Sequence, residues 1–151
     1  MPGKGEARLR LERFLPYRLS VTSNAVSSRI AAIYRARFGL SISEWRMIAV
    51  IAERGEPVQA ELVAATAMDK MTVSRAVSAL VARGLLRRDT SPADRRTAHL
   101  SLTAEGQRLY EEVAPLALAI EAELLAPLGE AERRKLFEML AMLEKAACRE
   151  S

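Results

Sequence analysis

The sequence is short of the residues from which most enzyme and metal sites are built. Its 151 residues include one cysteine, Cys148, and one histidine, His99. A lone cysteine excludes an internal disulfide and a cysteine-based metal cluster. No glycine-rich phosphate loop and no nucleophile with a histidine base can be assembled from the sequence. We therefore expect a protein that is not an enzyme and that holds no metal or other cofactor.

Long apolar runs are missing as well. No stretch of about 18 apolar residues is available to span a membrane, and Met1–Glu6 lacks the apolar character of a secretory signal. Half of the residues are nevertheless hydrophobic, and a chain of this length can bury a core without disulfides. We expect a compact domain in the cytoplasm, with no membrane partner.

Charge is distributed unevenly along the chain, although the net charge is only +4. Residues 1–38 carry a net +6, residues 39–68 a net −2, residues 69–102 a net +4 and residues 103–151 a net −4. A basic middle and an acidic last third suggest that these regions meet different partners, with phosphate a candidate for the basic part. A solvated basic face is the alternative that charge alone leaves open.

Apolar residues recur three and four positions apart near both ends of the chain, as in amphipathic helices. The pattern predicts a long helix over residues 11–38. A second long helix is expected after Thr103, continuing through Pro115, and a last helix after Gly129. The terminal stripes are rich in leucine, and a small lobe could not cover them alone, which indicates a homodimer.

Between the terminal helices, the sequence predicts a small lobe of three helices and a hairpin. A capping box at Ser41–Glu44 starts the first helix, and two short helices over residues 59–67 and 70–83 form a helix-turn-helix candidate. Leu85–Asp89 and Thr97–Leu102 read as strands with turn chemistry between them. The expected fold is mainly α with a small β-hairpin.

The helix over residues 70–83 has an apolar side and a short-chained polar side. The polar side suits entry into a major groove about 12 Å wide, and Arg75 is the natural partner for a guanine edge. Thr72, Ser74 and Ser78 could contact phosphate or thymine methyl groups. An ordinary surface helix is the alternative. The residues expected on the docked side are Val73, Ala76, Val77 and Leu80.

The tip of the predicted hairpin is basic. In the run Asp94, Arg95, Arg96, the carboxylate can hold one guanidinium while the other projects. That arrangement suits the insertion of an arginine into a narrow minor groove. An exposed loop of ordinary surface charge is the alternative for this triplet alone.

In this order and spacing, the segments resemble the MarR family of winged helix-turn-helix regulators, over about residues 10–147. The segments that carry the resemblance are Leu40–Trp45, Asp69–Arg75, Leu80–Arg88, Asp94–Arg96 and Leu102–Gly106. The resemblance implies one domain over residues 1–151, with a winged helix-turn-helix lobe at 40–102 and dimerisation helices at 10–38 and 103–147. It implies an obligate homodimer that reads a pseudo-palindromic site in double-stranded DNA. Val58 stands where the family often has a capping Thr or Ser.

Residues expected at the DNA follow from the helix, the hairpin and the family pattern together. Major-groove contacts fall on the helix, and Arg95 or Arg96 would enter the minor groove with Asp94 bracing the wing. The full expected set is Lys70, Met71, Thr72, Ser74, Arg75, Ser78, Arg87, Asp94, Arg95 and Arg96.

The resemblance also implies a small, often aromatic anion that binds between the dimerisation helices and the lobe and lowers DNA affinity. Arg46 could pair with its carboxylate. The alternatives are that Trp45 serves as the hydrophobic staple that packs against Leu40 at the start of its helix, and that Arg46 is simply solvated. The arginines of the first helix could instead bind the phosphates of a CoA thioester. The residues expected to wall the crevice are Tyr17, Ser20, Asn24, Tyr34, Trp45 and Arg46.

The leading interpretation is a ligand-responsive, dimeric transcriptional regulator, most simply a repressor. A constitutive or architectural DNA-binding protein without a ligand is the alternative. Some relatives resemble thiol-based oxidation sensors, but Cys148 lies in the last helix without a second cysteine, so we expect a passive thiol. His99 is expected near phosphate or in solvent rather than on a metal.

Overall fold

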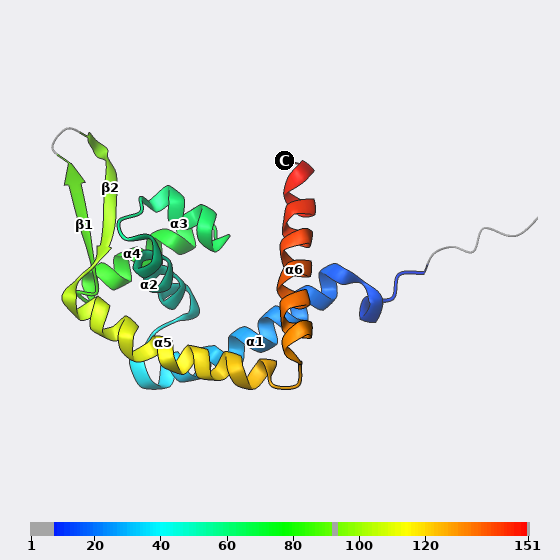
Figure 1. Ribbon diagram of the computed structural model, residues 1–151. Coiled ribbons are helices and arrows are strands. Elements are labelled where there is room, and N and C mark those ends of the chain that lie inside the picture. Colours follow the sequence, from blue (N-terminus) through cyan, green and yellow to red (C-terminus); the bar gives the residue numbers. More distant parts are fainter. Residues whose placement is uncertain (1–7, 92–93, 151) are drawn as a thin grey trace, which may run out of the picture. The chain divides into compact units, whose positions relative to one another are not determined.

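The computed structural model describes residues 8–91 and 94–150, with the backbone alone for residues 91, 94–96 and 150. The chain divides into two compact units, residues 1–111 and 112–151. The elements, shown in Figure 1, are η1 (Leu11–Arg13), α1 (Leu15–Phe38), α2 (Ile42–Arg54), α3 (Gln59–Thr66), α4 (Lys70–Ala82), β1 (Leu86–Ser91), β2 (Asp94–Leu102), α5 (Ala104–Leu125), α6 (Glu130–Ala147) and η2 (Cys148–Glu150).

The first long helix starts later than the sequence predicts. A short 3-10 turn, η1, occupies Leu11–Arg13, and α1 begins at Leu15. Pro16 then lies in the first turn, where a residue without an N–H group costs no helical hydrogen bond. Gly39 ends α1 in the left-handed conformation, with φ of 61°.

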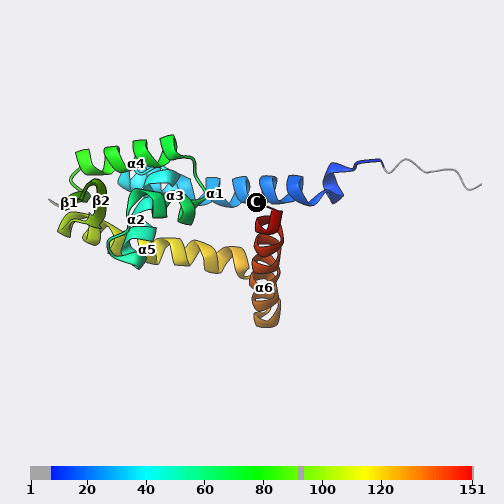
Figure 2. The same ribbon diagram turned by 90° about the horizontal axis from the view of Figure 1, so that it is seen from above.

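Helices α2, α3 and α4 pack against one another, and the hairpin contacts this cluster and projects from it (Figure 1, Figure 2). The predicted capping box is confirmed: the Glu44 N–H donates to Ser41 Oγ at 3.1 Å, and the Ser41 N–H donates to Glu44 Oε2 at 3.2 Å. The most deeply buried residues of these elements, each at most 1% exposed, are Met47, Ile48, Ile51, Leu62, Val73, Val77, Leu80 and Leu100.

The hairpin is longer than predicted. Its strands pair antiparallel with Leu86 opposite Leu102, and the ladder continues past Thr97 to Asp94. The turn predicted over residues 90–96 is therefore wrong for all of its described residues, because a register shift after Thr90 lets the backbone pairing go on toward the tip. At its other end β2 is held to the lobe, since the Leu100 N–H donates to Pro57 O at 2.9 Å.

Helix α5 starts on a side-chain cap and runs through Pro115, as predicted. The Gly106 N–H donates to Thr103 Oγ1 at 3.1 Å, which satisfies one of the unpaired amides of the first turn. In the second unit, Arg133 Nε donates to Leu125 O and Leu128 O at 3.1 and 3.0 Å and closes the turn before α6. No helix in the described part of the chain has the length and hydropathy to cross a membrane.

Candidate nucleic-acid interface

The start of α4 is organised by Asp69. Its Oδ1 accepts from the Thr72 N–H at 2.8 Å, and its Oδ2 accepts from the Thr72 hydroxyl at 2.7 Å. The Thr72 hydroxyl, followed by the Thr72 backbone amide, lowers the pKa of the Asp69 carboxyl. Asp69 is therefore a carboxylate at neutral pH, and both of its oxygens are engaged by one residue of the helix.

The two faces of α4 separate as the periodicity predicts. Every residue expected to dock, namely Val73, Ala76, Val77 and Leu80, is buried. On the other face Met71 is 63% exposed, Arg75 and Ser78 are exposed, and Thr72 and Ser74 are half-buried. Among the described side chains, no carboxylate forms an ion pair with Lys70 or Arg75. These two cations are available to an external anion.

A shallow groove of about 330 Å³ runs beside this face, between α4 and the start of α2. Arg75 and Thr72 border it on one side, and the capping residue Ser41 and the first turn of α2 border it on the other. Its lining residues are Ser41, Ser43, Glu44, Thr72, Arg75, Ala76 and Ala79.

The β1–β2 hairpin is the wing, and its base contributes two arginines with different partners. Arg87 Nε donates to Asp89 Oδ2 at 3.0 Å, so this predicted DNA contact already has a carboxylate beside it. Arg88 Nη2 donates to Ser78 Oγ at 3.2 Å and ties β1 to the exposed face of α4. Arg88 was not among the residues expected at the DNA, although the alternation of side chains along a strand separates it from Arg87.

The wing triplet Asp94, Arg95 and Arg96 lies in β2 by its backbone, and its side chains are outside the described residues. His99, further along the same strand, is exposed and places Nδ1 at 2.9 Å from Glu56 O. This contact anchors the wing to the loop before α3. In the described part of the chain, no cluster of His, Cys, Asp and Glu is arranged to hold a metal ion.

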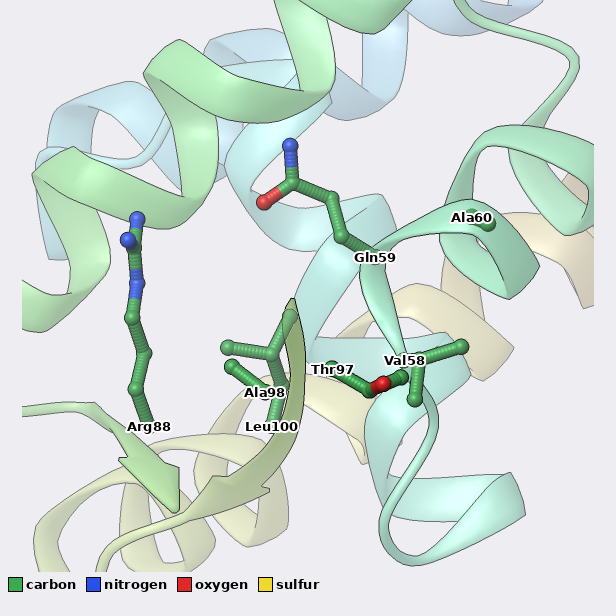
Figure 3. A pocket seen from close by; sticks show the side chains of 7 residues that line it. All are labelled: Val58, Gln59, Ala60, Arg88, Thr97, Ala98 and Leu100. Carbon is green, nitrogen blue, oxygen red and sulfur yellow. The ribbon is translucent and has the colours of Figure 1, made fainter. Parts of the chain in front are cut away.

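A cavity of about 350 Å³ separates the start of α3 from the wing (Figure 3). In Figure 3 Arg88 extends from β1 toward α4, and Gln59 extends from the start of α3. The residues that line the cavity are Val58, Gln59, Ala60, Arg88, Thr97, Ala98 and Leu100. None of them was singled out as a ligand residue from the sequence.

A second, smaller pocket of about 170 Å³ lies between α1 and α2. It brings together Tyr34, Trp45 and Arg46, three of the six residues expected around an effector. The other lining residues are Ser27, Ile30 and Ile42.

The remaining three expected effector residues do not line this pocket. Tyr17, Ser20 and Asn24 lie on earlier turns of α1 and are exposed. A helix rises about 1.5 Å per residue, so Tyr17 lies roughly 25 Å along α1 from Tyr34. A pocket of this size cannot take in both ends of that span.

Aromatic rings form the wall of the α1–α2 pocket. The Trp45 ring lies 5.1 Å from Tyr34 at 40° and stacks on Tyr110 at 5.8 Å and 15°. Tyr34 is 1% exposed, and burial raises its pKa to about 12. Its phenol therefore stays neutral at physiological pH and can donate a hydrogen bond to an anion. Tyr110 was missed, because it lies 65 positions beyond Trp45 in the sequence.

Known proteins resemble this chain most clearly over its middle part. The family model described as MarR family matches residues 38–97. The transcriptional regulator HosA of Escherichia coli O111:H- is 30% identical over 101 residues, which are 67% of this chain and 74% of HosA.

Two solved structures extend the match over most of the chain. A MarR/EmrR family transcriptional regulator from Acinetobacter sp. ADP1 superposes with a TM-score of 0.86 at 27% identity, covering 92% of this chain and 98% of its own. BpsR from Bordetella bronchiseptica, whose DNA binding is regulated by 6-hydroxynicotinic acid, gives a TM-score of 0.72 at 28% identity, with coverage of 84% and 98%.

Proposed function

The chain belongs to the MarR family of transcriptional regulators, and from this premise we propose that it is a homodimeric repressor which a small aromatic acid releases from its operator. The observation that carries the proposal is the outer face of α4. There an N-capped helix presents Arg75, which has no ion-pair partner among the described side chains, together with small hydroxyl residues and Met71 beside an open groove. A DNA-binding regulator works where the chromosome is, so we place it in the cytoplasm.

In the proposed complex α4 enters the major groove. Arg75 reads a guanine edge, because its guanidinium matches the O6 and N7 acceptors of that base. Lys70 and Ser78 flank it as backbone and base contacts. The wing follows the adjacent minor groove with Arg95 or Arg96, braced by Asp94, as the family resemblance implies. Arg87 contributes to DNA binding by giving up its ion pair with Asp89 and pairing with a phosphate of the DNA backbone instead.

Arg75→Ala is expected to weaken binding to a selected operator by roughly 1–3 kcal/mol and to relax base preference at one position of each half-site. The reason is the loss of a bidentate contact that only guanine completes. The measurement is fluorescence anisotropy with the selected DNA and its single-base variants at fixed salt.

Arg134→Ala is the matched control, because it removes the same charge from an exposed position of α6 in the other unit. It should leave both affinity and preference nearly unchanged. An Arg75→Ala variant that keeps the wild-type base preference would place the reading face elsewhere.

Exposed apolar residues support the dimer. At the start of the chain Leu11 and Leu15 are 50% and 46% exposed, and on α6 Phe137 and Met142 are 54% and 70% exposed. A monomer rarely leaves so many large apolar side chains in water on its terminal helices. A second copy that covers them would set two α4 helices about 34 Å apart, one turn of DNA.

The effector site that we propose is the pocket between α1 and α2. Its volume is well below the roughly 300–1,000 Å³ of sites for drug-sized ligands, and so suits a single ring. Trp45 and Tyr34 offer aromatic faces, Tyr34 a phenol, and the exposed Arg46 a cation for a carboxylate. An acid bound here lowers DNA affinity only if it binds the DNA-free arrangement more tightly.

Arg46→Gln is expected to raise the concentration of acid needed for half-maximal DNA release about tenfold, since a charge-assisted hydrogen bond contributes roughly 1.5–3 kcal/mol before solvent screening. The probes are 6-hydroxynicotinic acid and benzoic acid, titrated into the protein–DNA complex. Arg54→Gln, at the exposed end of the same helix, is the control with equal charge. Release of DNA by neither acid would favour the alternative of a ligand-independent DNA-binding protein.

A further inference from the structure

The hydroxyl group of Thr72 has a fixed direction in this structure. The Asp69 carboxylate carries no proton at neutral pH, so in the 2.7 Å contact the Thr72 hydroxyl is the donor. Its one proton is thereby used. Towards the outside, Thr72 presents only the lone pairs of Oγ1 and its methyl group.

The helix cap alone does not require this second contact. One oxygen of Asp69 satisfies the Thr72 amide, which is what an N-cap residue provides. The second oxygen binds the side chain instead. Asp69 also sets a negative charge, exposed to solvent, beside the face that meets DNA, where it repels phosphates and disfavours a phosphate next to Thr72.

We propose that Asp69 is a positioning residue which makes the Thr72 hydroxyl a hydrogen-bond acceptor. Thr72 then reads an exocyclic amino group of adenine or cytosine, an inference that rests on the proposed function. In the major groove the adenine N6 and cytosine N4 amino groups are the hydrogen-bond donors, whereas guanine and thymine offer acceptors. Phosphate oxygens are acceptors as well. An acceptor-only Thr72 therefore selects one class of base and does not contact the backbone.

Asp69→Asn reverses the direction of the hydrogen bond without removing the cap. The amide oxygen can still accept from the Thr72 N–H, and asparagine is as good an N-cap as aspartate. The amide nitrogen then donates to Thr72 Oγ1 and frees the hydroxyl proton to point outward. Asp69→Asn should thus convert Thr72 from an acceptor into a donor.

The experiment selects operators from random duplexes with the full chain and then measures relative affinities for single-base variants at each position. One position per half-site should prefer adenine or cytosine over guanine or thymine about 2- to 12-fold, the range of one hydrogen bond. Asp69→Asn should shift this preference towards guanine or thymine. Thr72→Ser should keep the wild-type preference, and Thr72→Val should lose it.

Glu61→Gln is the matched control, because Glu61 caps α3 through the Val58 N–H at 2.8 Å in the same lobe and loses the same charge. The Glu61→Gln variant should change the affinity for every duplex by the same factor and leave the base preference unchanged. An Asp69→Asn or Thr72→Val protein that keeps the preference for adenine or cytosine would overturn the proposal. A wild-type protein that binds no duplex would contradict the proposed function itself, and with it this reading of Thr72.

Discussion

Gly106→Ser is expected to lower the free energy of unfolding by about 3 kcal/mol, which for a chain of this size corresponds to a fall of roughly 6–12 °C in Tm. A Cβ atom at position 106 would overlap the carbonyl oxygen of Leu85 and lie 3.1 Å from its carbonyl carbon. Both neighbours are backbone atoms, so no side-chain rotation relieves the overlap. The start of α5 would have to move away from the root of the wing.

That movement would also strain two hydrogen bonds. The Thr103 N–H donates to Leu85 O at 3.1 Å, and the Thr103 hydroxyl donates to Gly84 O at 2.6 Å. Each contributes on the order of 1 kcal/mol. These bonds join the start of α5 to the residues before β1, so Gly106 is needed for α5 to pack closely against the root of the wing.

Gly129→Ser provides the matched control for this prediction. A Cβ at 129 would meet only the carboxylate oxygen of Glu132, at 3.7 Å, and serine is a favourable residue at the start of a helix. Urea titrations of both variants at one protein concentration give the comparison. Equal stability of Gly106→Ser and Gly129→Ser would show that α5 approaches the wing less closely than in this structure.

Local sequence signals predicted the elements that depend on neighbouring residues. The buried side of α4 followed from the spacing of Val73, Val77 and Leu80, because a helix repeats every 3.6 residues. The capping box at Ser41 spans only three positions. The family model and the relatives confirm the fold class that these signals indicated.

Contacts between distant residues could not be predicted in the same way. Arg83 donates to Phe38 O at 2.9 Å and to Gly39 O at 3.2 Å, and it lies 3.7 Å from Glu44. Neither helix propensity nor charge pattern connects positions about 40 residues apart. Because this arginine links the end of α4 to α1 and α2, the two helices that line the α1–α2 pocket, the surroundings of that pocket depend on tertiary structure and not on local sequence.

The same limit explains why the α1–α2 pocket gathers only three of the six residues expected around an effector. Tyr17, Ser20 and Asn24 were assigned to one crevice with Trp45, although a helix as long as α1 passes several environments. Where the pocket lies along α1 is decided by the place at which α2 packs on it. The pairing of Tyr34 with Trp45 marks that place.

Leu143→Glu is expected to produce a monomer and to lower operator affinity at least about 100-fold. Leu143 belongs to the leucine stripe of α6 and is 37% exposed, and in the proposed dimer it would be covered by the second copy. A glutamate there would bury an unpaired charge, which the interface cannot tolerate. A monomer places one α4 helix on the DNA and loses the gain from binding two half-sites together, which can reach 10²–10⁴-fold.

Lys145→Gln is the matched control, since it changes the net charge by the same amount at an exposed, already charged position on the other side of α6, about 160° around the helix from Leu143. It should remain dimeric in sedimentation and bind the operator like the wild type. Binding of Leu143→Glu to a single half-site should match that of the wild type, because α4 and the wing lie in the other unit. A monomeric Leu143→Glu protein with full operator affinity would show that one lobe suffices, whereas a dimeric variant would move the interface away from α6.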